Sequence, residues 1–319
     1  GGSIARLDPG GALVVGPESA GADPGPACYG KGEEVAVTDA NLLLGRLEPS
    51  FFLGGRFPIF PQRAQGALER LARQMKTDPL SAAEGVVRVV NANMERALRA
   101  SSLERGYDPR LFTLLAFGGA GPQHACELAE ALRIPRVLVP LFPGALSAFG
   151  VAIADIVKDL SRTVLLRQKD LTPEALALHY GELEERGRRQ MEAEGVPPDR
   201  LLLQRWLDMR YIGQSYELTV ECPPLGKALG QEAADRFHKA HLQRYGYSDP
   251  SHPVEVVNLR LKAVGIVDKP SLRRGDAAHA SPPKPAAQME EREVRFGGKP
   301  LRTPLYLRDK LEPGDRPRG

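Results

Sequence analysis

The stretch LLAFGGAGP, Leu114–Pro122, joins an apolar strand to a double-glycine turn and runs directly into QHACELAEALRI, which has helical spacing. A strand that turns straight into a helix places free backbone N–H groups beside the positive end of the helix, where a phosphate or the polar edge of a nucleotide can bind. Glycines let a ligand approach the main chain, and Pro122 suits the first helical turn because its missing N–H needs no partner there. The same pattern also serves as tight packing in α/β domains. The stretch alone therefore leaves ligand binding and plain packing both open.

The residues around this stretch alternate between strand and helix patterns. Residues 1–155 begin with two strand-like runs separated by the turn Pro9-Gly10-Gly11, and helical patterns follow at 63–75 and 79–106. The strand before the glycine turn and the run at 136–140 complete the alternation. Short connections between such segments predict an α/β domain with a parallel or mixed sheet covered by helices.

The pattern changes after Asp155. Residues 156–269 contain long strand-like runs around a charged amphipathic helix that Pro173 opens, which predicts an α+β domain with a largely antiparallel sheet. Residues 270–319 are expected to hold an exposed linker, Pro270 to Pro285, and a β-hairpin that turns at Gly297-Gly298.

Composition narrows the function classes. The chain has 319 residues, of which 42% are hydrophobic, and its 43 basic and 40 acidic residues give a net charge of +3. This balance argues against a nucleic-acid-binding surface, and the absence of an apolar run of about 18 residues argues against a membrane-spanning helix. Three widely spaced cysteines, Cys28, Cys126 and Cys222, form no CxxC pair and suit a reducing cytoplasm. Cys126 is expected to be buried on its helix.

Several long runs in order carry a resemblance to a known family. They are GGSIARLDPGGALVVGPESAGADPGPACYG, VTDANLLLGRL, NANMERALRASSLERGYDPR, the glycine-turn region, LDMRYIGQSYEL and RYGYSDPSHPVEVVNLRLKAVG. Together they closely resemble the hydantoinase A / 5-oxoprolinase family, which includes ATP-dependent N-methylhydantoinase and acetone carboxylase subunits. The resemblance implies an α/β fold: the second lobe of an actin-like (ribonuclease H-like) ATPase, followed by an α+β C-terminal domain.

The resemblance also predicts that this chain is a C-terminal fragment or one half of a split polypeptide. Family members begin with a long N-terminal lobe, and they carry two Asp-x-Gly-Gly-Thr phosphate loops before the region that this chain matches. No Asp-Gly-Gly-Thr occurs in the sequence, and Gly1-Gly2 resembles the end of a glycine run. The expected partners are therefore the missing ATPase lobe and a hydantoinase B-like subunit, in an oligomer.

The function that the resemblance implies is ATP-driven opening of a cyclic amide such as a hydantoin or 5-oxoproline. ATP would phosphorylate the amide oxygen so that water can attack, and Mg²⁺ would neutralise the phosphates. ATP-dependent carboxylation of a ketone is the alternative within the family. A non-catalytic fragment that docks a partner subunit is the alternative from another class, because a nucleotide held by one lobe loses most of its phosphate contacts.

Within this resemblance, the glycine turn and its helix supply the candidate nucleotide site. The cofactor-binding candidates are Gly118, Gly119, Ala120, Gly121 and Pro122. His124 lies in the first turn of the helix, where the positive end of the helix favours a neutral ring. It is a catalytic candidate, with a helix-surface histidine as the equal alternative.

Two other segments supply candidates near the start of the chain. The loop PESAGADPGPACYG offers Glu18, Ser19 and Asp23, which could orient a substrate amide or hold Mg²⁺ through water. Asp23-Pro24-Gly25 is also a turn sequence, and this reading is favoured for Asp23. Asp39, in the run TDAN, is a candidate general base or metal ligand, although an N-cap is the simpler explanation.

Polar residues inside other segments are expected to have structural roles. Asn91 and Asn93 interrupt a helix rich in Val, Ala and Leu, so each needs hydrogen-bond partners. Pairing with the glycine turn is favoured over contact with a nucleotide. In the second domain, strand alternation places Asp208 and Arg210 on one face, which predicts cross-strand ion pairs. His238 and His241 are spaced for one face of a helix and are expected to face solvent.

Overall fold

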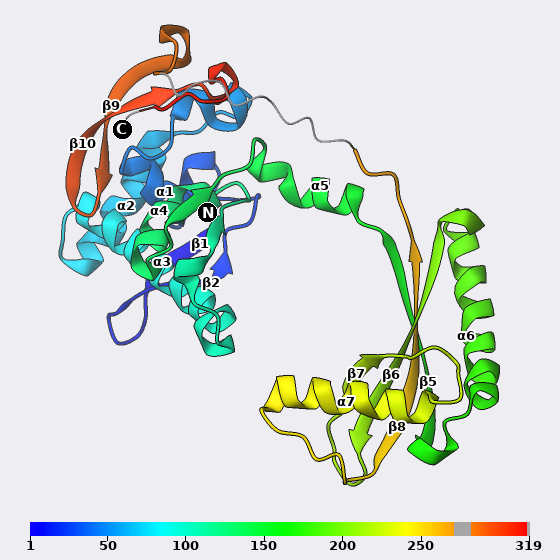
Figure 1. The fold of residues 1–319 in the computed structure, drawn as a ribbon. Coiled ribbons are helices and arrows are strands. Elements are labelled where there is room, and N and C mark those ends of the chain that lie inside the picture. Colours follow the sequence, from blue (N-terminus) through cyan, green and yellow to red (C-terminus); the bar gives the residue numbers. More distant parts are fainter. Residues whose placement is uncertain (271–281, 318–319) are drawn as a thin grey trace. The chain divides into compact units, whose positions relative to one another are not determined.

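The computed structural model of the chain describes residues 1–270 and 282–317. The chain folds into two compact units (Figure 1). The first is Gly1–Phe149 together with the C-terminal segment, and the second is Gly150–Leu272. The predicted linker lies mostly outside the described residues.

The N-terminal half of the first unit is an antiparallel hairpin packed against helices. The two strands pair from Ser3 with Ser19 to Leu7 with Leu13, as the turn at Pro9-Gly10-Gly11 predicts. Small and branched residues fill the core between hairpin and helices, among them Ala5, Val37 and Leu68. The elements are β1 (Ser3–Leu7), β2 (Leu13–Ser19), α1 (Val37–Leu43), α2 (Pro61–Met75) and α3 (Pro79–Ser101).

The glycine-turn region forms a second small layer of the first unit. Strand β3 (Thr113–Leu115) pairs in parallel with β4 (Arg136–Leu138), and α4 (Gly121–Leu132) connects them. Helix α5 (Leu146–Ile153) follows. The expected parallel pairing is present, but β1–β2 and β3–β4 are two separate sheets and not one continuous sheet. Residues 35 and 36 already occupy part of the open edge of β1, through a bridge between Ile4 and Ala36.

The second unit is a four-stranded antiparallel sheet with two helices, which confirms the predicted α+β arrangement. The strand order is β5-β8-β6-β7. Both helices contribute to one apolar core, in which Tyr180 and Phe237 are the largest fully buried side chains. The elements are β5 (Ile156–Arg167), α6 (Pro173–Ala193), β6 (Leu201–Tyr211), β7 (Leu218–Glu221), α7 (Leu229–Tyr245) and β8 (Val254–Gly265).

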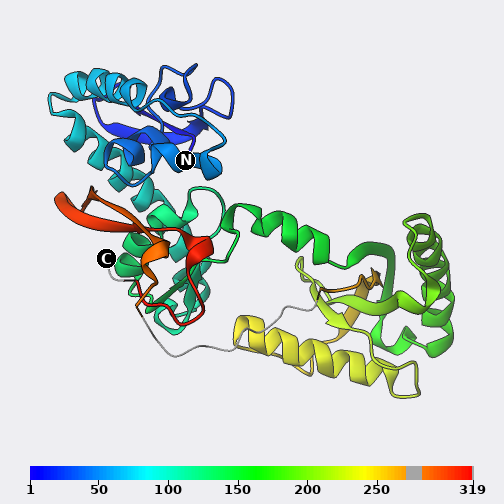
Figure 2. The ribbon, with the colours of Figure 1, turned by 90° about the horizontal axis from the view of Figure 1, so that it is seen from above.

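The predicted C-terminal hairpin is present and returns to the first unit (Figures 1 and 2). It consists of β9 (Gln288–Phe296) and β10 (Lys299–Tyr306), with Gly297-Gly298 at the turn. The Arg295 N–H donates to the Leu44 carbonyl at 2.9 Å, so the hairpin is fastened at the end of α1. Two ion pairs add to this attachment: Arg292 with Glu48 at 2.6 Å and Arg295 with Glu84 at 3.0 Å.

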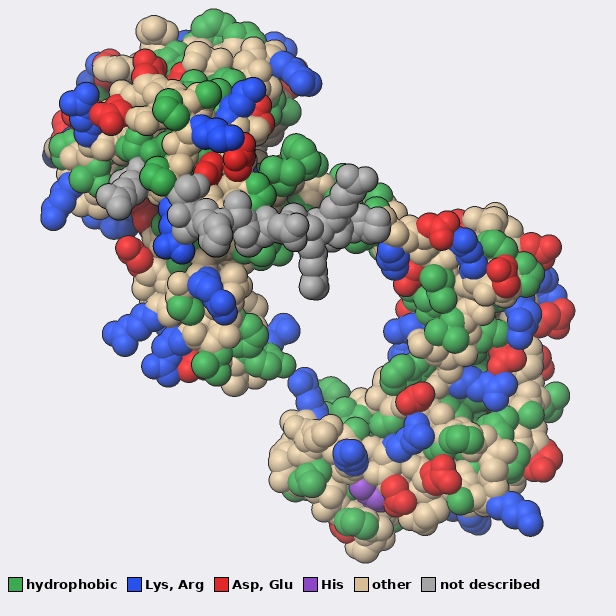
Figure 3. Space-filling model, turned by 45° about the horizontal axis from the view of Figure 1, so that its top comes forward, with side chains coloured by type: hydrophobic (Ala, Val, Ile, Leu, Met, Phe, Trp, Pro, Cys, Tyr) green, Lys and Arg blue, Asp and Glu red, His purple; other side chains and the backbone are tan. Residues whose placement is uncertain are grey.

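The surface agrees with the near-neutral composition. Lys and Arg side chains are interspersed with Asp and Glu on the face drawn in Figure 3. Within the described ranges, no helix is long and apolar enough to cross a bilayer. The expectation for Cys126 was wrong, because its side chain is exposed on α4, whereas Cys28 is buried.

Candidate functional site

The glycine turn keeps an open face toward solvent. Gly118 has a φ of +83°, a conformation that favours glycine, and its N–H donates to the Pro143 carbonyl at 2.8 Å. A Cβ added at Gly118 or Gly119 would meet no atom of the described residues within 4 Å, so these residues leave the space beside both glycines open. This is the space that a ligand needs to approach the main chain.

The start of α4 has unused hydrogen-bond donors. Its N-cap, Ala120, provides no side-chain hydrogen bond, and Pro122 occupies the first turn. Across the described part of the chain, no acceptor is found for the N–H groups of Gly119 and Ala120. A helix N-terminus that lacks a cap has positive electrostatic potential and free donors, which suits an anion or a nucleotide edge.

The predicted site segments meet at Gly1 and Gly2. The Thr38 N–H and hydroxyl both donate to the Gly1 carbonyl, at 2.9 and 3.0 Å, and the Ala20 N–H donates to the Gly2 carbonyl at 2.8 Å. A Cβ built at Gly1 would lie 3.5 Å from the Ala120 Cβ. The 18–23 loop, the start of α1 and the glycine turn are therefore brought together around the first two residues. Sequence reasoning noticed the glycines at this position but assigned them no place in the site.

Asp39 holds two backbone segments together. Its carboxylate accepts hydrogen bonds from the N–H groups of Ala27 at 3.1 Å, Cys28 at 2.7 Å and Ala36 at 2.8 Å, and no part of the residue is exposed. Ala36 is the N-cap of α1, so the carboxylate joins the helix start to the PGPAC turn. As a general base or metal ligand, Asp39 would have to give up these bonds. The geometry favours the capping explanation over the catalytic one.

The loop candidates are exposed and locally paired. Glu18 forms an ion pair with Arg6 on the neighbouring strand, and Asp23 forms one with Lys31 at 3.1 Å. The Ser19 hydroxyl accepts the Gly21 N–H at 3.2 Å. Of the three candidates, Ser19 lies nearest the meeting point, since a Cβ at Gly2 would approach its hydroxyl to 2.8 Å.

His124 is buried between α4 and α3. Only 3% of the residue is exposed, and its Nδ1 lies 2.8 Å from the Asn91 Oδ1. Burial lowers the pKa of His124 to about 4, and the positive charge of Arg46 acts in the same direction. The alternative of a surface histidine is wrong, and the expectation of a neutral ring agrees with this environment.

The buried His124 is expected to make the folding stability of the chain depend on pH. An unfolded histidine titrates near 6.5, so on acidification the unfolded state takes up this proton before the folded state does. The stabilising contribution of the neutral ring is complete above about pH 6.5 and falls by about 2 kcal/mol at pH 5. Urea unfolding of the wild type and His124→Gln at pH 7 and pH 5 measures this term. A stability difference between the two proteins that stays the same at both pH values would contradict it.

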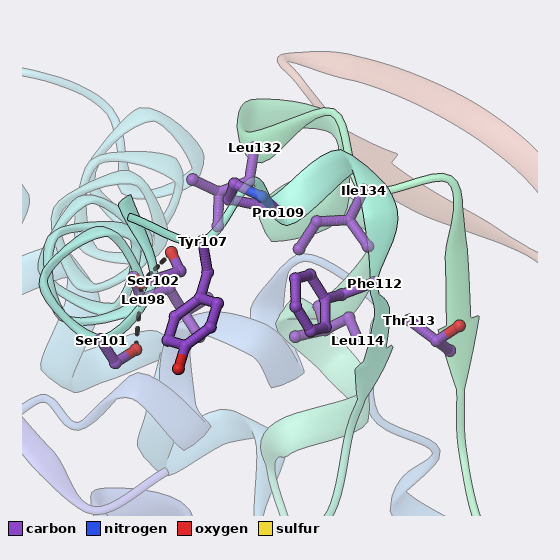
Figure 4. A pocket seen from close by; sticks show the side chains of 10 residues that line it. All are labelled: Leu98, Ser101, Ser102, Tyr107, Pro109, Phe112, Thr113, Leu114, Leu132 and Ile134. Atoms are coloured by element: carbon purple, nitrogen blue, oxygen red, sulfur yellow. Dashed lines mark hydrogen bonds between the residues drawn. The ribbon is translucent and has the colours of Figure 1, made fainter. Parts of the chain in front are cut away.

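The apolar cavity of the first unit lies away from these residues (Figure 4). It has a volume of about 270 Å³ and is lined by the beginning of β3, the ends of α3 and α4, and Tyr107 and Phe112. Among the hydroxyl groups of its lining, those of Ser101 and Ser102 both donate to the Leu98 carbonyl and are therefore already satisfied. The glycine turn follows the other end of β3. This cavity offers no charged group for phosphate or metal chemistry.

The polar residues of the second unit have structural partners, as predicted for the strands. Asp208 pairs with Arg260 at 2.6 Å, and Arg210 pairs with Glu255 at 2.8 Å. The expectation that His241 faces solvent was wrong, since only 2% of it is exposed, and its Nδ1 lies 2.8 Å from the Tyr247 carbonyl oxygen. Within residues 1–270 and 282–317, no group of three or more His, Cys, Asp or Glu side chains is arranged to hold a metal ion.

Comparison with known proteins identifies the family. The family model described as hydantoinase/oxoprolinase matches residues 1–160, and the hydantoinase/oxoprolinase C-terminal domain matches residues 167–319. The chain is 38% identical over 325 residues to the caprolactamase subunit alpha of Pseudomonas jessenii, covering 98% of this chain and 46% of that one. It is 32% identical to 5-oxoprolinase 1 of Arabidopsis thaliana, covering 94% of this chain and 25% of that one.

Solved structures give the same result. This chain superposes on the nucleotide-free structure of acetone carboxylase with a TM-score of 0.84 at 26% identity. That structure is described as bearing on the mechanism of ATP-dependent acetone carboxylation. The structure of the ATP-dependent caprolactamase from Pseudomonas jessenii superposes with a TM-score of 0.75 at 37% identity. Each comparison covers 98% of this chain and 46% of the other, so the chain spans less than half the length of these relatives. With matching family models over nearly all of its length, the chain belongs to the hydantoinase/oxoprolinase family.

Proposed function

We propose that this chain is part of an ATP-dependent hydrolase that opens a cyclic amide ring, and that its glycine turn binds the nucleotide. The observation that carries the proposal is the meeting of the open glycine turn, the uncapped start of α4 and the Gly1–Gly2 segment at one place. The names of the relatives, a caprolactamase and a 5-oxoprolinase, support the cyclic-amide substrate class. In this proposal the first unit is a lobe of an actin-like ATPase.

The residues present fit a nucleotide better than they fit a metal ion. Free space beside Gly118 and Gly119 allows a planar base or a ribose to contact the main chain, and the N–H groups of Gly119 and Ala120 can bind its acceptor atoms. ATP supplies the phosphoryl group that makes the amide oxygen a leaving group. Water would then add to the ring carbon and the C–N bond would break, leaving an acyl phosphate, and a second water molecule would hydrolyse the acyl phosphate to the carboxylate and inorganic phosphate. Mg²⁺ enters the proposal with the phosphates, since hydrolysis of this kind uses the metal to neutralise their charge.

A second candidate function has its own support. The TM-score of 0.84 is to an acetone carboxylase, so an ATP-dependent ketone carboxylase is an equal alternative. Both functions require the nucleotide at the glycine turn, and they differ in the acceptor that is phosphorylated. In either case the proposal includes a further ATPase lobe and a hydantoinase B-like subunit as partners. The third alternative, a non-catalytic docking fragment, predicts no nucleotide binding at the turn.

Gly119→Val is expected to abolish binding of ATP with Mg²⁺ and to leave the fold intact. The reason is that the valine side chain enters space that is empty in the structure and that the nucleotide would occupy. Gly119 has no positive φ, so the substitution causes no backbone strain. Calorimetric titration of both proteins measures the binding, and thermal unfolding checks the fold.

The control is Gly181→Val on α6 of the second unit: its side chain also enters open space, it shares no contact with the glycine turn, and it should leave ATP binding unchanged. Equal ATP affinity in the wild type and Gly119→Val would place the nucleotide elsewhere. If the wild type does not bind ATP at millimolar concentration, the titration is repeated after the proposed further ATPase lobe has been added as a second polypeptide. Failure in that second titration favours the docking fragment.

A further inference from the structure

A buried ion pair lies behind the candidate site. The Arg46 side chain is only 5% exposed, and its Nη2 donates to the Glu127 Oε1 at 2.7 Å. The Arg46 Nε donates to the Arg295 carbonyl at 3.0 Å, and the guanidinium stacks over the Phe296 ring with 4.6 Å to its centroid. Because it pairs with an arginine that is always charged, Glu127 is present as a carboxylate, which can only accept hydrogen bonds.

This carboxylate fixes the orientation of Asn91. The Asn91 Nδ2 donates to the second carboxylate oxygen of Glu127. An amide with its nitrogen directed at an acceptor presents its oxygen on the other side, and the Asn91 Oδ1 lies 2.8 Å from the Nδ1 of His124. The reverse orientation would bring the amide oxygen against the carboxylate. Asn91 therefore offers His124 an acceptor and not a donor.

The oriented amide in turn fixes the proton on His124. An acceptor 2.8 Å from Nδ1 requires that Nδ1 carry the hydrogen. Burial keeps the ring neutral at pH 7, so Nε2 is left with a free lone pair. The groups that face the ring are Asn91 and Glu127, together with the positive charge of Arg46, which opposes a second proton on the ring.

The Nε2 atom is the ring nitrogen that does not face Asn91 of α3. His124 stands in the first turn of α4, directly after the glycine turn. Gly1 approaches Ala120. The free acceptor is therefore close to the place where the proposed nucleotide segments meet.

We infer that Arg46, Glu127 and Asn91 are positioning residues that hold His124 in the Nδ1–H form, so that its Nε2 accepts a hydrogen bond from a hydroxyl in the candidate site. The hydroxyl belongs to the nucleotide ribose or to a water molecule, which share this chemistry. The inference rests on the proposed function for its ligand, but the protonation state of His124 can be measured without one. If these residues served only to join α3 to α4, it would not matter whether Nε2 carries a hydrogen.

The first experiment determines the proton position in the free protein. The full 319-residue chain is labelled with ¹⁵N-histidine, and the two ring nitrogens of His124 are observed at pH 7, with assignment by the His124→Gln variant. The expected result is a protonated Nδ1 and an unprotonated Nε2. A protonated Nε2, or a cationic ring at this pH, would overturn the inference.

Variants test whether the network sets this state. Glu127→Gln keeps the shape of the side chain but can present either an oxygen or an N–H to Asn91, so His124 is expected to become a mixture of the two neutral forms. Asn91→Leu removes the acceptor and should give a mixture as well. The matched control is Asn93→Leu on the same helix, because the one hydrogen bond found for the Asn93 side chain among the described residues goes to the Val15 carbonyl, at 3.3 Å. A single unchanged Nδ1–H form in both network variants would overturn the inference, provided that thermal unfolding shows the variants folded.

Nucleotide titrations identify the hydroxyl. ATP is expected to shift the Nε2 signal, and Asn91→Leu is expected to weaken ATP binding by up to about tenfold. If the donor is a ribose hydroxyl, one of the two analogues, 2′-deoxy-ATP or 3′-deoxy-ATP, leaves the ¹⁵N signal of Nε2 where it is in the free protein. If the donor is a water molecule, both analogues shift this signal as ATP does. ATP binding without any change at Nε2 overturns the inference. The two proposals can fail separately. If His124 has the expected protonation but the chain binds no ATP, either alone or with the further ATPase lobe added, the proposed function is contradicted and the positioning network is upheld.

Discussion

Asp39→Asn is expected to lower the melting temperature of the first unit by roughly 10 °C, which corresponds to a loss of about 3 kcal/mol or more. The buried carboxylate accepts three backbone N–H groups, from Ala27, Cys28 and Ala36. An asparagine side chain has only one acceptor atom and turns an NH₂ group toward at least one of these donors. Each donor left without a partner in the interior costs about 1–3 kcal/mol. Differential scanning calorimetry measures the change.

A matched variant separates this structural effect from the loss of a surface charge. Asp23→Asn removes a carboxylate from the loop that the Asp39 carboxylate holds, but Asp23 is exposed, and among the described residues its ion-pair partner is Lys31. An exposed ion pair contributes about 0–1 kcal/mol, so the melting temperature should hardly change. An Asp39→Asn protein as stable as Asp23→Asn would show that the three hydrogen bonds do not hold the loop. The catalytic interpretation of Asp39 would then regain support.

Gly45→Ala is expected to detach the C-terminal hairpin. Gly45 follows the last turn of α1, and a Cβ at this position would lie 2.4 Å from the Glu293 carbonyl oxygen. This contact is with backbone and not with the end of a flexible side chain, so β9 must move away. Its movement would strain the Arg295–Leu44 hydrogen bond next to it. Hydrogen exchange of the β9 and β10 amides should accelerate by at least about tenfold, which corresponds to 1.4 kcal/mol of local stability.

The control must share the backbone strain of the substitution. Gly45 has a φ of +73°, and Gly54 has a φ of +70° but meets nothing within 4 Å of an added Cβ. Gly54→Ala therefore carries the same conformational cost without the collision. Exchange of the hairpin amides should be unchanged in this variant. Equal acceleration in both variants would assign the effect to strain at a left-handed position and not to the approach of β9.

The local features of the fold could be predicted from the sequence because neighbouring residues determine them. The glycine turn that enters α4, the hairpin at Gly297-Gly298 and the antiparallel sheet of the second unit each follow from turn residues and periodicity. Asn91 could also be recognised as a residue in need of a partner, since it interrupts an apolar helix.

The contacts within the candidate site could not be predicted, because they join residues that lie far apart in the sequence. His124 meets Asn91 across 33 positions, and Arg46 meets Glu127 across 81. The one signal present was that Glu127 follows His124 by three positions, which places both on one face of α4. For Asp39, the sequence allowed both a cap and a catalytic group. Only the three N–H groups around its carboxylate favour one of them.

The return of the C-terminal hairpin to the first unit makes the second unit an insertion in the chain. The first unit is assembled from residues before 150 and residues after 272, so its two parts are joined in space and not in sequence. The two family models meet between residues 160 and 167. A truncation there would remove Arg292 and Arg295, which pair with Glu48 and Glu84, and with them the Arg295 carbonyl that accepts a hydrogen bond from Arg46. Recombinant production of the first unit by itself therefore needs a fusion of the N-terminal part to the hairpin, with a short linker in place of the second unit.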